Sequence, residues 1–73
     1  MNYWTLQMLR RFRNGDRLKF GYKSEAFFEL QGIPLKAEGV LRKAKIPYVE
    51  ITENGSVFKI PFEYIECPEV VLP

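Results

Sequence analysis

The chain has 73 residues, of which 47% are hydrophobic and 27% are charged, and its formal net charge is +2. This length predicts one small domain, residues 1–73, whose core needs aromatic bulk; six Phe, four Tyr and one Trp supply it. Cys67 has no partner for a disulfide, no apolar run is long enough to span a membrane, and histidine is absent. We therefore expect a soluble cytoplasmic binding protein without catalysis, metal or cofactor.

The charge is divided unevenly along the chain. Residues 1–45 contain ten Lys or Arg and four acids, a net charge of +6, whereas residues 46–73 carry a net charge of −4. Such an asymmetry bears on long-range attraction and on the choice of partner rather than on the fold. The alternative is that the two halves fold against each other and partly cancel.

A short helix is predicted for residues 1–13, with Asn2 as its N-cap. Asn14 and Gly15 would end it, since both residues tolerate the left-handed conformation that closes helices. A helix this short is marginal in water, so its apolar stripe should dock on the domain, with Trp4 plugging one end of a barrel. The residues of that stripe, at near-helical spacing, are Trp4, Met8, Leu9 and Phe12.

Two strands are predicted between the helix and residue 46. Residues 17–22 alternate strictly, which places Leu18, Phe20 and Tyr22 on one face and the cations on the other. Residues 24–32 fit a single helical turn or a strand edge, and we interpret them as an irregular loop. Residues 35–46 predict a long, curved strand in which Gly39 marks a bulge or bend.

A β-hairpin is the clearest local pattern. Residues 48–52 and 56–60 alternate, and between them lies the dipeptide Asn54-Gly55, which suits a tight hairpin turn. We expect residues from this hairpin to meet Phe20 in one core. The candidates are Val49 or Ile51, and Phe58 or Ile60.

The chain end predicts a single helical turn followed by a last strand. Pro61 ends the second hairpin strand because it cannot donate a ladder hydrogen bond, and residues 61–66 are typical of one 3-10 turn. Residues 67–73 form either a terminal strand or a frayed tail. The fold class is therefore mainly β: about five short strands in a small SH3-like barrel over residues 16–66, with an N-terminal helix.

Three segments resemble small SH3-like barrels. NGDRLKF at 14–20 is similar to the opening strand of SH3-like, Tudor-like and KOW-like modules, and VFKIPFEYIE at 57–66 is similar to the ending of SH3 domains. Residues 38–55 resemble the barrel appended to SprT-like proteases. The zinc-binding HExxH motif of those proteases is missing, as is the acidic, aromatic loop by which SH3 domains hold proline-rich ligands. The resemblance therefore implies the barrel alone.

Basic residues are the candidate binding site. If the predicted strands are neighbours, their cations form one stripe that can follow a phosphate backbone, with Tyr22 or Tyr48 at its edge for base stacking. Three arginines at the helix end, Arg10, Arg11 and Arg13, would extend its reach. The alternative is that these cations only keep sheet edges soluble. The predicted nucleic-acid-binding residues are Arg17, Lys19, Arg42, Lys43 and Lys45.

A protein-interaction module is the alternative function. If the helix does not dock inward, Tyr3, Trp4 and Met8 form an exposed apolar anchor of the kind that often dominates interface energetics. The same surface would serve self-association, so a monomer or a weak homo-oligomer is expected. Glu63, Glu66 and Glu69 recur every three residues and are interpreted as a solvated acidic face rather than a metal site.

Overall fold

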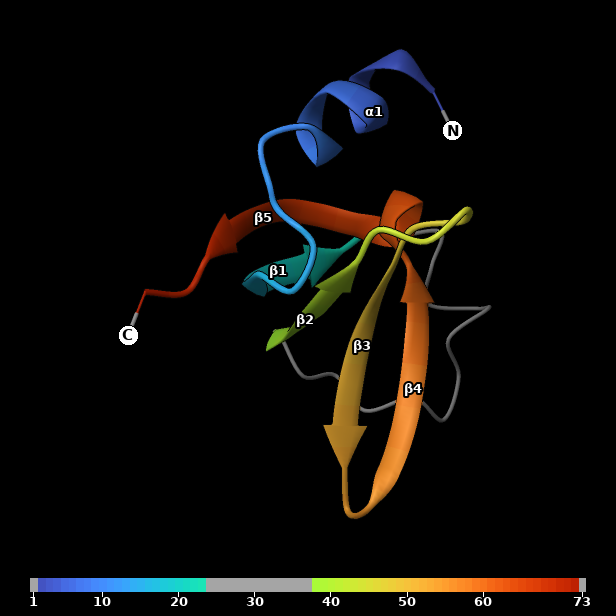
Figure 1. The fold of residues 1–73 in the computed structure, drawn as a ribbon, viewed down its shortest axis with the longest axis vertical. Coiled ribbons are helices and arrows are strands. Elements are labelled where there is room, and N and C mark those ends of the chain that lie inside the picture. The colour runs from blue at the N-terminus through green and yellow to red at the C-terminus, as the bar shows by residue number, and fades with distance from the viewer. Residues whose placement is uncertain (1, 24–37, 73) are drawn as a thin grey trace.

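The computed structural model describes residues 2–23 and 38–72, and Figure 1 shows their arrangement. The prediction for residues 24–32 lies outside this part of the chain. No helix within the described ranges is long and apolar enough to cross a membrane. The elements, in chain order, are α1 (Tyr3–Leu9), β1 (Arg17–Tyr22), β2 (Glu38–Arg42), β3 (Tyr48–Glu53), β4 (Ser56–Pro61), the 3-10 helix η1 (Phe62–Tyr64) and β5 (Ile65–Val70).

The five strands form one antiparallel sheet in the order β4-β3-β2-β1-β5. Strands β1 to β4 pair successively as a meander, and β5 returns to pair with β1. The mainly β fold with a helix before the sheet and a 3-10 turn before the last strand is confirmed. The prediction that the strands close into a barrel was wrong, because β4 and β5 are the outer strands of an open sheet.

Helix α1 begins as predicted and ends earlier. The Asn2 side chain accepts a hydrogen bond from the backbone N–H of Thr5 at 2.8 Å, which caps the first turn. After Leu9 the backbone bonds tighten to the i−3 pattern, with the Phe12 N–H donating to the Leu9 carbonyl at 3.2 Å. This tightening ends the helix at Leu9 rather than at residue 13 and brings Phe12 into the core.

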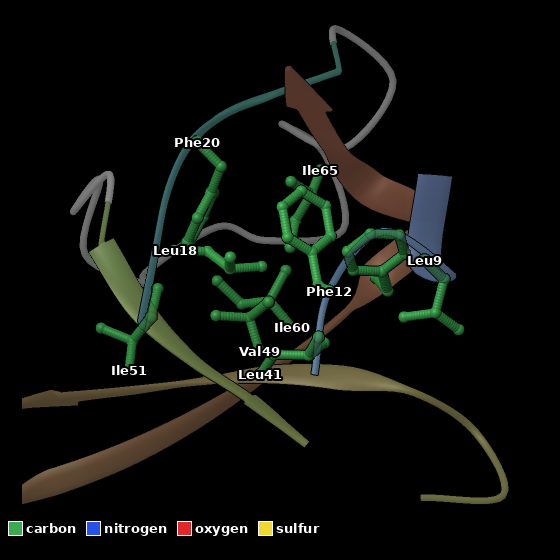
Figure 2. Close-up of a cluster of buried hydrophobic side chains, with 10 residues drawn as sticks. Leu9, Phe12, Leu18, Phe20, Leu41, Val49, Ile51, Ile60 and Ile65 are labelled. Carbon is green, nitrogen blue, oxygen red and sulfur yellow. The ribbon is translucent and has the colours of Figure 1, made fainter. Parts of the chain in front are cut away.

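One face of the sheet carries the core. Figure 2 shows Leu18, Val49 and Ile60 converging on a common centre, with Phe12 near Ile65 and Leu9 at the outer side of the cluster. The strict alternation of β1 holds, since Leu18 and Phe20 are buried while Arg17, Lys19 and Gly21 are exposed. The prediction that hairpin residues share a core with Phe20 is confirmed for Val49, Ile51 and Ile60, and the partly buried Phe58 packs against this core. The buried apolar residues are Leu9, Phe12, Leu18, Phe20, Leu41, Val49, Ile51, Ile60, Phe62 and Ile65.

The predicted hairpin is confirmed in register and turn. Glu53 pairs with Ser56, so Asn54 and Gly55 form a two-residue loop. Both have positive φ, 51° and 79°, which is the backbone of a type I′ turn. This turn twists in the same sense as the strands and therefore fixes β3 against β4 without a register slip.

Strand β2 is shorter and more regular than predicted. It ends at Arg42, and residues 43–47 form a loop. The pairing with β1 runs without interruption through Leu18 opposite Gly39, so Gly39 forms no bulge against β1. The glycine is needed for space: a Cβ atom there would lie 2.8 Å from the Glu50 carbonyl oxygen of β3.

The last strand starts earlier than predicted. The single turn over residues 62–64 is confirmed, but β5 follows it at once, and Val71 lies beyond the strand. Along β1, Lys19 and Gly21 are two residues apart, whereas their partners Glu69 and Glu66 on β5 are three apart. The extra residue is accommodated at Cys67, whose φ is +50°, so β5 contains a β-bulge.

Candidate functional site

Three of the five predicted nucleic-acid contacts lie on the outer face of the sheet, opposite the core. Arg17 Nε lies 3.2 Å from Glu38 Oε2, and Arg42 Nε lies 3.5 Å from Glu50 Oε2. Lys19 is directly opposite Glu38 on β2 and Glu69 on β5, and cross-strand partners project from the same face. On the outer face of the sheet, Arg17, Lys19 and Arg42 therefore lie among carboxylates.

An open hollow of about 410 Å³ lies on this face, across β1, β2 and β3. Its lining includes the cations Arg17 and Lys19 and the carboxylates Glu38 and Glu50. An anion that entered it would meet both signs of charge. The sheet face is therefore weakly selective for phosphate on electrostatic grounds.

The other two predicted contacts lie in a loop. Lys43 and Lys45 follow β2, so the prediction that they lie within the strand of residues 35–46 was wrong. The backbone N–H of Lys43 donates to Asn14 Oδ1 at 2.8 Å instead of to a neighbouring strand. This bond joins the loop after β2 to the loop after α1.

Two backbone hydrogen bonds join the loop after α1 to the end of β2, just before the loop that contains the lysines. The Gly15 N–H donates to the Leu41 carbonyl and the Leu41 N–H donates to the Asp16 carbonyl, each at 2.8 Å. Figure 1 shows the loop after α1 running past the end of β2. The helix-end arginines and the loop lysines therefore belong to one region. We call this region the basic end; its exposed cations are Arg10, Arg11, Arg13, Lys43 and Lys45.

Few carboxylates neutralise the basic end. Within residues 2–23 and 38–72 only two ion pairs form, both on the sheet face, so the basic end takes part in neither. Asp16 Oδ2 accepts from the backbone N–H of Arg13 at 2.8 Å, and Glu63 lines a small hollow together with Lys45. Five exposed cations thus share a region with two acids. Sequence reasoning assigned the arginines a secondary role because only the long-range bonds reveal that they meet the lysines.

The two tyrosines predicted to stack on bases are both half-buried. Tyr22 packs edge-on against Phe20, with ring centroids 5.6 Å apart, and burial raises the pKa of its hydroxyl above the usual value. Tyr48 is covered by Lys59, whose Nζ lies 5.3 Å from the ring centroid. Neither ring offers an open platform for a base.

The aromatic pair at the start of α1 is exposed instead. Trp4 is 77% exposed and Tyr3 is 65% exposed, so the expectation that Trp4 plugs the domain was wrong. The helix docks through Thr5 and Leu9, which are buried, while Met8 packs partly against the core. Because Thr5 is polar, the sequence pattern concealed the true docking stripe.

A shallow hollow of about 190 Å³ lies beside this pair, between α1 and the start of β5. Trp4 and Met8 form its helical side, and Ile65, Cys67 and Lys23 form its other side. Cys67 is a free, exposed cysteine. The described part of the chain contains no group of three or more Cys, Asp or Glu side chains that could hold a metal ion.

The chain was also compared with known proteins. The exposed cations and aromatic rings are the features from which a function can be inferred, because no family model, no curated protein and no solved structure matches this chain.

Proposed function

We propose that this protein is a small, non-catalytic binding domain that holds nucleic acid through the basic end, with little sequence selectivity. The observation that carries the proposal is the hydrogen bond from the Lys43 N–H to Asn14, which joins the loop after α1 to the loop after β2. These two neighbouring segments carry the five exposed cations of the basic end, and the acids found beside them are Asp16 and Glu63. The meander with a 3-10 turn before the returning last strand supports an SH3-like assignment of the fold.

Phosphate is the chemistry that these cations fit. Lys and Arg that neutralise backbone phosphates release condensed counterions, which favours binding at low salt and carries no sequence information. Arg17 and Arg42 are less suited, because each would have to exchange a carboxylate partner for a phosphate. Four or five contacts predict a slope of log affinity against log salt of about −4 for duplex DNA.

The test is a titration of labelled duplex and single-stranded oligonucleotides, followed by fluorescence anisotropy at two salt concentrations. A basic-end variant carries Arg13→Gln, Lys43→Gln and Lys45→Gln. A matched sheet-face variant carries Arg17→Gln, Lys19→Gln and Arg42→Gln, and therefore loses the same net charge. The basic-end variant should reduce the salt slope by about 3, since each lost phosphate contact removes about 1.

The sheet-face variant should keep most of the wild-type affinity and slope. Absence of wild-type binding at low salt would refute nucleic-acid binding altogether. Equal losses in the two variants would refute the basic end as its location and point to the summed field of the protein.

A protein-interaction function through Tyr3, Trp4 and Met8 is the second candidate. The exposure of both aromatic rings favours it, because large aromatic side chains often act as anchors in interfaces. Under this alternative, Trp4→Ala abolishes binding to a protein partner and leaves oligonucleotide affinity unchanged.

A further inference from the structure

The exposed face of α1 carries aromatic rings at one end and arginines at the other. Seven residues make nearly two full helical turns, so Tyr3 and Arg10 project from the same side of the helix, about 10 Å apart along its axis. The Arg10 N–H still donates to the Leu6 carbonyl at 3.2 Å, so the helical geometry holds over this distance. Arg11 follows in the tighter turn, where its N–H donates to the Met8 carbonyl at 3.1 Å.

The charge along this face is of one sign. Residues 1–15 contain three arginines and no Asp or Glu. Arg10 and Arg11 are exposed, and both belong to the basic end. The aromatic pair and the first cations of the proposed phosphate site therefore lie at the two ends of one short helix.

The two rings are available to separate bases. They meet edge to face, with centroids 5.6 Å apart and an interplanar angle of 79°, so neither ring is stacked on the other. Trp4 and Tyr3 are largely exposed, and each has a free π-face for stacking. Duplex bases are already stacked within the helix, whereas the bases of a single strand can turn to meet two rings of different orientation.

We infer that the nucleic acid held by this protein is single-stranded, with bases stacked on Trp4 and Tyr3 and the adjoining phosphates on Arg10 and Arg11. The inference rests on the proposed function and specifies its ligand. The nucleic-acid backbone then continues toward Arg13 and Lys43, because the Lys43 N–H donates to Asn14, the residue that follows Arg13 in the chain. The aromatic rings give the preference for single strands, and the basic end gives the salt dependence.

Trp4 is the single tryptophan of the chain, so its fluorescence reports on this site alone. The test titrates the wild-type protein with oligo(dT) of about twelve nucleotides, a length within the usual site size for single-strand binders. The matched probe is an abasic oligomer of the same length, which keeps the phosphates and lacks the bases. Oligo(dT) should quench Trp4 to saturation, and the abasic oligomer should bind more weakly without quenching.

Trp4→Ala should weaken oligo(dT) binding by about five-fold to a hundred-fold, measured by anisotropy of the labelled oligomer, and should leave abasic binding unchanged. Its side chain is largely exposed, so the variant should fold, which a circular dichroism spectrum verifies. The control is Val57→Ala, an exposed apolar residue on β4 that should change neither affinity.

The outcomes separate the two proposals. If neither oligomer binds, the proposed function fails and the inference fails with it. If oligo(dT) binds without quenching Trp4, or binds no more tightly than the abasic oligomer, the inference is overturned while phosphate binding stands. An unchanged oligo(dT) affinity in Trp4→Ala likewise overturns it.

Discussion

Among the glycines within residues 2–23 and 38–72, Gly39 leaves the least room for an added methyl group. A Cβ atom there would lie 2.5 Å from Val49 Cγ1, 2.8 Å from the Glu50 carbonyl oxygen and 3.0 Å from Ile51 Cγ1. Non-bonded carbon atoms prefer about 3.5–4.0 Å, and the carbonyl belongs to the β3 backbone, so β2 and β3 must separate. We expect Gly39→Ala to lose about 2–3 kcal/mol of unfolding free energy.

Urea denaturation followed by circular dichroism measures this loss, and a thermal scan should show a melting temperature lower by roughly 10–20 °C. The control is Gly21→Ala on β1, where the new Cβ would lie 3.7 Å from the Glu66 carbonyl oxygen, an ordinary contact. Gly21→Ala should be neutral or stabilise by up to about 1 kcal/mol, because alanine loses less backbone entropy on folding. A Gly39→Ala midpoint equal to that of Gly21→Ala would refute the close approach of β2 to β3.

Three further predictions concern the helix, the bulge and pH. Asn2→Ala should lose about 1 kcal/mol of unfolding free energy in urea, because the Thr5 N–H loses its capping acceptor. Cys67→Val should lose about 1–2 kcal/mol while Cys67→Gly keeps its stability, because φ is +50° there; equal midpoints would contradict the bulge. The raised pKa of Tyr22 means that the unfolded chain ionises first, so stability should fall as pH rises above about 10, and less so in Tyr22→Phe.

Most of the fold could be predicted from short-range sequence patterns. The alternation at 17–22 indicates a strand buried on one side, and the Asn54-Gly55 dipeptide suits only a few tight turns. The Asn2 cap and the single turn after Pro61 are equally local. In each case the deciding interactions join residues a few positions apart, and a sequence displays such interactions directly.

The features that sequence reasoning missed depend on distant contacts. Strand β2 stops at Arg42 because the next N–H is taken by Asn14, 29 positions away. The bulge at Cys67 depends on how β5 registers with β1, and the exposure of Trp4 depends on Thr5 occupying the docking face. The prediction of the candidate site was the least accurate, because its cations come from two loops that only the tertiary fold brings together.

The most direct measurement of where nucleic acid binds is a ¹H–¹⁵N correlation spectrum of the labelled protein, recorded during titration with oligo(dT). Binding at the basic end predicts amide shift changes in residues 10–15 and 43–47, the two loops joined through Asn14. The outer-face residues of β1, β2 and β3 should change little, because their arginines stay with Glu38 and Glu50. Shift changes confined to that sheet face, with residues 10–15 unaffected, would contradict the account.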